Sequence, residues 1–240
     1  MPRFSITKDN IQNNVAVISG DDYKHIVKVL RLKVGDSITL FDTTSTEYYA
    51  NIQEITKREI FLQIKESKQI FTESPIRITL LQGLPKADKM DYIIEKATEL
   101  GAYKIVPVIT ERSQFTKIDR KKRWDRISLE ASKQCGRTNP TIIENTLNFK
   151  DAVNIYNKEE LAVILQVNSE VLAKDYIKNS LQVPQNIVLF VGPEGGFTDN
   201  EVLLGKQMGF ISLGLGPRVL RTETVSVSVL SILQFHYGDM

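Results

Sequence analysis

The hydrophobic pattern of this 240-residue chain changes near residue 76, and that change restricts the possible folds more than any other feature. Beyond it, continuous apolar runs alternate with stretches of helical spacing. The runs span residues 76–81, 104–109, 161–167, 187–191 and 210–215. Apolar runs of this length are typical of strands buried on both faces, and their alternation with helices predicts an α/β fold with a mostly parallel sheet.

Helical spacing is clear in two segments between these runs. The apolar side chains of the first are Met90, Ile93, Ile94, Ala97 and Leu100, followed by Gly101. Those of the second are Trp124, Ile127 and Ala131, with Gln134 or Cys135 on the same stripe. Residues 225–236 fit two periods, because Val225, Val227 and Val229 alternate with serines while the apolar positions also recur at helical spacing. The pattern alone leaves strand and helix open there.

The first seventy residues show a different pattern, in which short β-type runs are separated by turn signals. The runs span residues 15–18, 37–41, 48–52 and 60–64. A helix carrying Ile26, Val29 and Leu30 is predicted to interrupt them, and short strands at this spacing indicate a small barrel. Residues 67–75 are the predicted linker, so we expect two domains, 1–72 and 73–240.

Basic side chains are concentrated in one segment, although the net charge is only +2. Residues 111–137 hold nine basic and four acidic side chains. The basic ones are Arg112, Lys117, Arg120, Lys121, Lys122, Arg123, Arg126, Lys133 and Arg137. Such a run is either the solvated face of an amphipathic helix or a surface that contacts nucleic-acid phosphates. His25 with Arg31 leaves the same two possibilities, structural or RNA-binding.

Cysteine and histidine content excludes several classes of protein. One cysteine cannot form an intramolecular disulfide, and two histidines with one cysteine cannot furnish a metal cluster, so no metal site is expected. The amino terminus lacks the features of a signal peptide, and the apolar runs are far shorter than the ~20 residues that span a membrane. We therefore expect a cytoplasmic protein without a membrane partner.

Two glycine-containing loops follow predicted strands and are the strongest candidates for a ligand site. The first is GPEGGF from Gly192, which precedes a helical stretch beginning near Thr198, and the second is LGLGPRVLRTET from Leu213. Glycine lets the backbone approach a ligand closely, and ligands of α/β sheets bind at the carboxyl ends of the strands. The alternative is a tight strand-to-helix turn. The spacing of the first loop fits neither the dinucleotide fingerprint nor the P-loop.

Six motifs, taken in order, carry a resemblance to one known family. They are His25-x-x-x-Val29-Leu30-Arg31 with Gly35-Asp36, KMDYIIEKATELG from Lys89, Pro107 with Arg112-Ser113, Glu130-Ala131-x-x-Gln134-x-x-Arg137, GPEGGF from Gly192, and LGPRVLRTETV from Leu215. With these motifs the chain closely resembles the bacterial small-subunit (16S) ribosomal RNA uracil-N3 methyltransferases of the SPOUT class. The resemblance covers essentially the whole chain.

That resemblance implies a fold and a cofactor. The fold would be a small amino-terminal PUA-like β-barrel that binds RNA, followed by a trefoil-knotted α/β methyltransferase domain that works as a homodimer, with residues 222–236 helical. The methyl donor would be S-adenosylmethionine. The residues implied to hold it are Leu165, Gln166, Val167, Gly192, Glu194, Gly195, Gly196, Leu213, Leu215, Gly216, Leu220 and Thr222.

The implied reaction is methylation of N3 of a uridine in 16S ribosomal RNA of the small ribosomal subunit. Glu194 or Glu223 is the candidate base that removes the N3 proton, and Arg221 the candidate that stabilises negative charge on the uracil. The candidate RNA contacts are His25, Arg31, Arg112, Lys121, Lys122, Arg123 and Arg137. Two other classes stay open: a non-catalytic RNA-binding ribosome-assembly protein, which has no need of two glycine loops, and a phosphoryl-transfer enzyme, whose lysine and metal carboxylates are missing.

Overall fold

The chain forms two compact units. A computed structural model describes residues 1–114, 120–155, 161–180 and 182–240. The first unit consists of Met1–Glu73 and Ser132–Pro140, and the second of Ser74–Ala131 and Thr141–Met240. The predicted domains, 1–72 and 73–240, have a single division between residues 72 and 73, with 132–140 in the second domain. The structure instead groups this segment with the first unit, a return of the chain that a linear pattern does not indicate.

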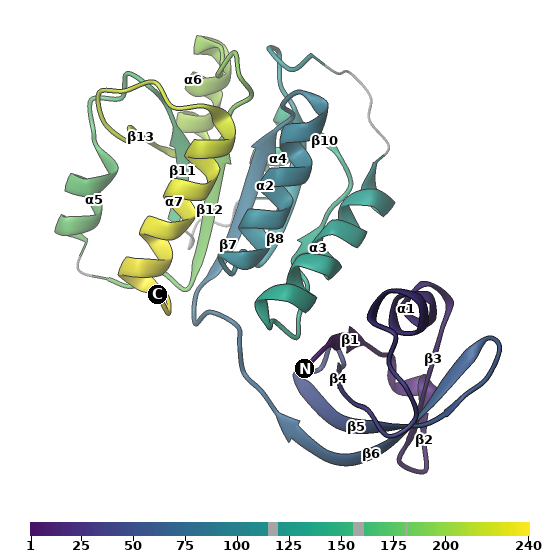
Figure 1. Cartoon of the computed structure of the whole chain (residues 1–240). Coiled ribbons are helices and arrows are strands. Elements are labelled where there is room, and N and C mark those ends of the chain that lie inside the picture. The colour runs from purple at the N-terminus through teal and green to yellow at the C-terminus, as the bar shows by residue number, and fades with distance from the viewer. Residues whose placement is uncertain (115–119, 156–160, 181) are drawn as a thin grey trace. The chain divides into compact units, whose positions relative to one another are not determined.

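The first unit is built on a curved six-stranded sheet (Figure 1). Its strands are β1 (Arg3–Ser5), β2 (Ile11–Gln12), β3 (Val15–Ser19), β4 (Ser37–Phe41), β5 (Thr46–Ile55) and β6 (Glu59–Gln69), in the order β1-β4-β5-β6-β3-β2. The β1–β4 pair is parallel, and the other pairs are antiparallel. All four predicted strands are confirmed. The prediction missed β1 and β2, which are too short to show a period.

A helical segment interrupts the strands, as predicted, although only Ile26 of its predicted apolar residues is buried and Val29 and Leu30 are exposed. Helix α1 (Gly20–Lys24) continues into a π-helical turn, η2 (His25–Leu30), and a short 3₁₀ turn, η1 (Lys8–Asn10), lies earlier in the chain. Ile26 is fully buried in a core that also contains alternate residues of β3 and β6. Arg31 ends the turn with a φ of 54°, in the left-handed region that non-glycine residues seldom adopt.

Ion pairs and hydrogen bonds attach the 132–140 segment within the first unit. The Arg3 guanidinium lies 2.7 Å from Glu47 and donates to the carbonyl oxygen of Arg137 at 2.8 Å. The Lys133 ammonium lies 3.0 Å from Asp22 of α1. Part of the basic segment thus has acidic partners inside the protein.

The second unit contains a parallel sheet of seven strands. These are β7 (Arg77–Gly83), β8 (Lys104–Ile109), β9 (Ile142–Ile143), β10 (Leu147–Asn148), β11 (Leu161–Leu165), β12 (Asn186–Val191) and β13 (Ile211–Leu213). Their order is β10-β8-β7-β12-β11-β13, and β9 also pairs with β8. All of these pairs are parallel. The five predicted strands are confirmed, while β9 and β10 were not predicted.

Helices cover both faces of this sheet, as Figure 1 shows. The helices are α2 (Ala87–Glu99), α3 (Lys121–Cys135), α4 (Phe149–Val153), α5 (Ala173–Asn179), α6 (Asp199–Gln207) and α7 (Thr222–Tyr237). Residues of α2, α5 and α7, with Trp124 of α3, share one core with the strands. Residues of α4 and α6 share the other. Both faces of the strands are therefore buried, which explains their continuous apolar runs.

Residues 222–237 form helix α7, which settles the ambiguity of the carboxy-terminal segment. The buried side chains Ser226, Val229, Leu230 and Leu233 recur at helical spacing and pack beside α2. Burial on one helical face thus outweighs the strand preference of the valines. Within the four described ranges, no helix combines the length and hydropathy needed to cross a membrane.

Candidate functional site

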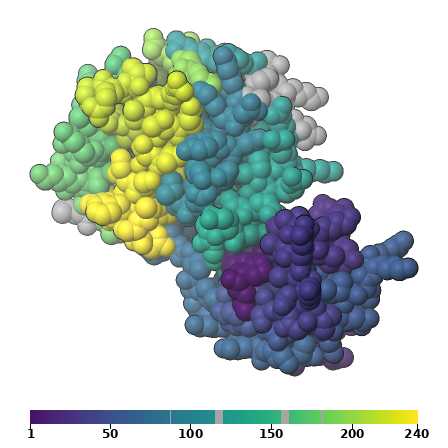
Figure 2. Space-filling model, viewed as in Figure 1, coloured from purple at the N-terminus to yellow at the C-terminus, as the bar shows by residue number. Residues whose placement is uncertain are grey.

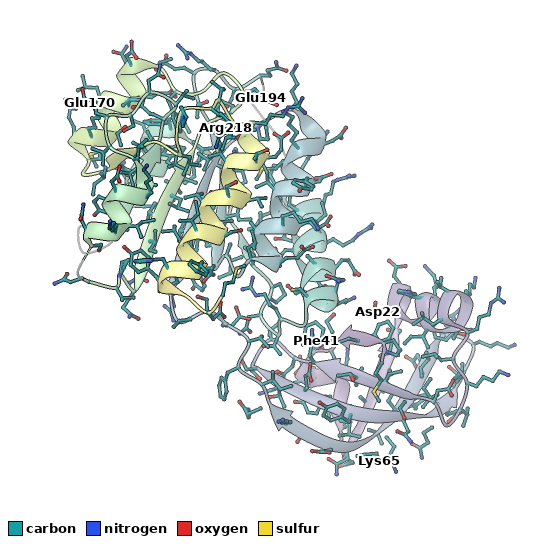
Figure 3. The ribbon with its side chains drawn as sticks, turned by 60° about the vertical axis from the view of Figure 1, so that its left-hand side comes forward. Asp22, Phe41, Lys65, Glu170, Glu194 and Arg218 are labelled. Carbon is teal, nitrogen blue, oxygen red and sulfur yellow. The ribbon has the colours of Figure 1, made fainter. Side chains whose placement is uncertain are left out.

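A cavity of about 700 Å³ lies in the second unit where strands β11, β12 and β13 end. Its wall consists mainly of three loop segments, residues 165–168, 191–199 and 215–222, together with Lys89, Arg112 and Val225. Figure 3 shows Glu194 and Arg218, which belong to two of these loops, at the same end of the unit. Volumes of 300–1,000 Å³ are usual for small-molecule sites.

The glycines of these loops serve different purposes. A Cβ on Gly192 would lie 3.2 Å from the backbone of Gly196, so Gly192 allows the loop to fold back on itself. Gly196 and Gly216 have φ values of 67° and 119°, with nothing within 4 Å of an added Cβ. A Cβ on Gly195 would instead meet the Arg112 side chain at 3.1 Å. A ligand can therefore approach the backbone closely at Gly196 and Gly216, whereas protein occupies the space beside Gly195.

A buried polar network lies beneath the cavity and joins three elements. The Gln82 amide, at the end of β7, donates to the Thr222 hydroxyl at 3.1 Å and accepts from the Ser226 hydroxyl at 2.6 Å. The Thr222 hydroxyl in turn donates to the Gly192 carbonyl oxygen at 2.6 Å. Gln82 and Ser226 are fully buried. The network holds the first turn of α7 against the loop that follows β12.

A cluster of three charges lies beside the cavity. The Lys89 ammonium, in the first turns of α2, lies 3.1 Å from Glu194 Oε1 and 3.2 Å from Glu223 Oε2. Glu194 Oε1 also accepts the Lys86 backbone N–H at 3.2 Å. Two of the three predicted catalytic residues thus share one cation, which the sequence analysis did not select. Lys89 and Glu194 line the cavity, whereas Glu223 does not.

This contact keeps both Lys89 and Glu194 charged. Burial acts to raise the pKa of the Glu194 carboxyl, but hydrogen bonds from backbone N–H groups and from Lys89 outweigh it and lower that pKa. Burial opposes charge on Lys89 as well, yet the carboxylates of Glu194 and Glu223 beside it raise the pKa of its ammonium. A carboxylate with a lowered pKa is a weaker proton acceptor, which argues against Glu194 as general base.

Three arginines lie on the cavity wall. Arg112 donates from Nη1 to the Gly195 carbonyl oxygen at 2.8 Å. Arg218 and Arg221 are exposed, and the residues that the structure describes include no acidic partner for either. Arg221 caps the amino terminus of the 16-residue helix α7, whose dipole adds positive potential there. Arg221 therefore lies both at the helix terminus and on the cavity wall.

The structure brings together eleven of the twelve residues predicted to hold a cofactor. Leu213 is the exception, because it lies in the hydrophobic core with 3% of its surface exposed. The lining residues that were not predicted are Lys89, Asn168, Val191, Pro193, Phe197, Asp199, Arg218, Val219 and Val225. Lys89 begins one of the quoted motifs, but its partners lie more than 100 positions away, and no local pattern indicates them.

The predicted RNA contacts are spread over both units. Lys121 and Arg123 of α3 have ion pairs with Asp125 at 2.9 Å and Asp91 at 2.6 Å. Lys122 between them is exposed, with no ion pair among the described residues. The predicted Lys117 lies outside the described residues. The helix is therefore basic and solvated, and both interpretations of its charge still apply.

In the first unit, His25 and Arg31 are exposed, but Arg137 is not. The His25 ring packs edge-on against Phe4, with centroids 5.9 Å apart. Arg137 is only 5% exposed, and its guanidinium is paired with Glu73. Arg137 therefore holds the 132–140 segment in place, and its assignment as a phosphate contact is withdrawn.

Comparison with known proteins identifies both parts of the chain. The family model for an RNA methyltransferase domain matches residues 72–234, and that for an RNA methyltransferase PUA domain matches residues 18–65. Ribosomal RNA small subunit methyltransferase E of Bacillus subtilis is 32% identical over 97% of this chain and 94% of its own length.

Two solved structures match the whole chain. Ribosomal RNA small subunit methyltransferase E from Neisseria gonorrhoeae, bound to S-adenosylmethionine, has a TM-score of 0.90 and 30% identity, over 100% of this chain and 99% of that one. A Legionella pneumophila protein with the same bound cofactor has a TM-score of 0.90 and 35% identity, with the same coverage. The predicted fold class, a PUA-like part followed by a SPOUT-class α/β part, is confirmed. The chain therefore belongs to the family of ribosomal RNA small subunit methyltransferases E.

Proposed function

We propose that the protein transfers the methyl group of S-adenosylmethionine to N3 of a uridine in 16S ribosomal RNA, in the cytoplasm and as a homodimer. One observation carries the proposal: the cavity collects the loops that the family resemblance assigns to the donor, although these loops are far apart in sequence. The relatives named above support both the reaction and the donor.

The cavity fits such a donor. Its wall combines apolar side chains, including Leu165, Leu215 and Leu220, with backbone of the glycine loops and with the carboxylate of Asp199. Apolar walls suit a purine ring, backbone groups provide directional hydrogen bonds, and a carboxylate suits a cation. The donor, when bound, supplies an electrophilic methyl group on a positively charged sulfur.

The protein must make N3 of the uridine nucleophilic. N3 carries a proton near neutral pH and takes part in base pairing, so the base has to be unpaired and the proton removed. Arg221 and the amino terminus of α7 are placed to stabilise the resulting negative charge. Of the two proposed bases, Glu194 has a lowered pKa and Glu223 does not line the cavity. Both carboxylates are better suited to hold Lys89.

RNA would be bound by exposed basic side chains near the cavity and on the first unit. Arg112 lines the cavity, and Lys121, Lys122 and Arg123 provide positive charge on α3. His25 and Arg31 are exposed on the PUA-like unit. Contacts of this type bind the phosphate backbone and depend on salt concentration.

The surface of α7 supports the proposed homodimer. This helix buries Val229, Leu230 and Leu233, but leaves Ile232 39% exposed and Phe235 76% exposed. Figure 2 shows the carboxy-terminal segment, in yellow, as part of the surface of the second unit. Apolar side chains of this size on a helix are typical of subunit contacts. Sedimentation as a monomer at concentrations where methylation proceeds would contradict the dimer.

The alternative, a non-catalytic RNA-binding ribosome-assembly protein, explains the basic side chains and the PUA-like unit. It does not explain a cavity formed by three loops at the strand ends, or relatives that bind S-adenosylmethionine.

The decisive experiment combines calorimetric titration of the purified protein with S-adenosylmethionine and a methylation assay on 16S ribosomal RNA and on small subunits. Mass spectrometry of the digested RNA should identify 3-methyluridine. Arg221→Ala should lower the single-turnover rate far more than the donor affinity, because it removes an interaction that strengthens in the transition state. Failure of the parent protein to bind the donor would exclude the methyltransferase function, and another methylated atom would exclude uridine N3.

A further inference from the structure

We infer that Lys89 is a catalytic residue, whose ammonium donates a hydrogen bond to a carbonyl oxygen of the target uracil and thereby promotes ionisation of N3. This inference rests on the proposed function and assigns Glu194 and Glu223 the role of holding that ammonium. Three observations support it: the number of hydrogen-bond donors, the fixed position of the group, and the poor fit of Glu194 and Glu223 to the role of base.

A lysine ammonium has three N–H donors. Two carboxylate oxygens form ion pairs with it, Glu194 Oε1 at 3.1 Å and Glu223 Oε2 at 3.2 Å. Among the described residues Glu223 Oε2 accepts no hydrogen bond, so these ion pairs do not use all three donors, and Lys89 forms part of the cavity wall. An acceptor bound in the cavity is therefore a natural partner for an N–H of Lys89.

Three elements of the fold fix the position of the Lys89 ammonium. Lys89 belongs to α2, Glu194 to the loop after β12, and Glu223 to the first turn of α7, whose packing the Gln82 network maintains. The Arg218 and Arg221 side chains are exposed instead. A donor that needs no reorientation stabilises developing charge more effectively than a mobile one. Among the described residues that line the cavity, Lys89 is the cation held by two carboxylates.

The proposed step balances without a protein base. The N3–H bond breaks and its proton passes to water, while N3 keeps the electron pair and the negative charge spreads to the adjacent carbonyl oxygens. The Lys89 N–H and Arg221 stabilise this charge. The N3 electron pair then forms the bond to the methyl carbon, and the electron pair of the carbon–sulfur bond returns to sulfur. Lys89 keeps its proton throughout.

The test is Lys89→Met, which retains a chain of similar length but removes the charge and the donors. Lys96→Met is the matched control: Lys96 lies on the same helix, its side chain has the same 30% exposure, and its ammonium contacts Glu95 and Glu99, each at 2.8 Å. Lys96 does not line the cavity. Single-turnover methylation is measured at saturating donor on two RNAs, one with uridine and one with 5-fluorouridine, whose electron-withdrawing fluorine makes N3 more acidic.

On unmodified RNA, Lys89→Met should lower the rate constant by about 10²-fold, the usual effect of losing one oxyanion donor, and Lys96→Met should leave it unchanged. On 5-fluorouridine RNA the ratio of parent to Lys89→Met rates should shrink by about tenfold or more, because an acidic N3 needs less help to ionise. The donor dissociation constant, measured by calorimetry, should change much less than the rate.

A rate ratio that is the same on both RNAs would overturn the inference, and so would a loss explained by donor affinity or by the melting temperature. Those results would show that Lys89 only clamps the loops. Lys89→Arg is the second variant, for the case in which Lys89→Met does not fold, because it keeps a cation between the carboxylates. Its loss of rate on uridine RNA should be smaller than that of Lys89→Met and should also shrink on 5-fluorouridine RNA. A loss of rate that is the same on both RNAs would refute the role. Absence of 3-methyluridine with the parent enzyme would count against the proposed function instead.

Discussion

Replacing Gln82 by methionine should destabilise the second unit measurably, although no charged group and little volume are removed. Gln82 is fully buried, and its amide donates to the Gly83 carbonyl oxygen at 2.9 Å and to the Thr222 hydroxyl at 3.1 Å, while accepting from Ser226 at 2.6 Å. Methionine has a similar length and cannot form these bonds. The change therefore isolates the polar contribution from the packing contribution.

The size of this destabilisation depends on which buried groups lose their only hydrogen-bond partner. Thr222 still donates to the Gly192 carbonyl oxygen, and Ser226 still reaches the Thr222 carbonyl oxygen at 3.1 Å. The two bonds that Gln82 donates contribute about 1 kcal/mol each, and a buried acceptor left without its donor adds about 1–3 kcal/mol. A destabilisation of about 3–5 kcal/mol corresponds to a melting temperature lower by about 6–20 °C for a chain of this size.

Thermal denaturation followed by circular dichroism, with Gln53→Met as the control, measures this effect. Gln53 is an exposed strand residue in the first unit, so its substitution should leave the melting temperature nearly unchanged. Calorimetry should also show weaker binding of S-adenosylmethionine to Gln82→Met, because the link between α7 and the Gly192 loop is broken. A melting temperature equal to that of the parent would show that the network contributes no net stability, and the reasoning would be wrong.

Three further predictions concern single positions. Lys122→Gln should lower the slope of log RNA affinity against log salt by about 0.7–0.9, and Lys121→Gln by less because Asp125 already pairs with it at 2.9 Å; equal slopes in filter-binding titrations would contradict this. Gly196→Ala should cost about 1–2 kcal/mol in urea unfolding because φ is 67°, and an unchanged midpoint would refute that strain. The lowered pKa of Glu194 stabilises the fold above its ordinary pKa of about 4.3, and this stability is lost as pH falls through the lowered value. The stability difference between Glu194→Gln and the parent should therefore be greater at pH 7 than in acid, and a pH-independent difference would count against the ion pair.

Most of the architecture of the second unit could be predicted from the sequence. Its strands are buried on both faces, so they appear as continuous apolar runs that need no knowledge of their neighbours. The glycine loops were equally visible because they follow those runs directly. Segment 222–237 could not be decided locally, since its valines favour a strand while its burial in one core requires a helix.

The candidate site shows the same division between local and long-range information. Glu194, Arg221 and the glycines of the site belong to local motifs, so the sequence alone was enough to select them as candidates. Only the tertiary structure decided their partners. Arg137 looks like any other basic residue until Glu73 is found beside it, and Lys89 gains its significance from Glu194 and Glu223, 105 and 134 positions further along the chain. Hydrogen bonds and ion pairs depend on distances of about 3 Å between residues remote in sequence, and local hydrophobic periodicity carries no information about those distances.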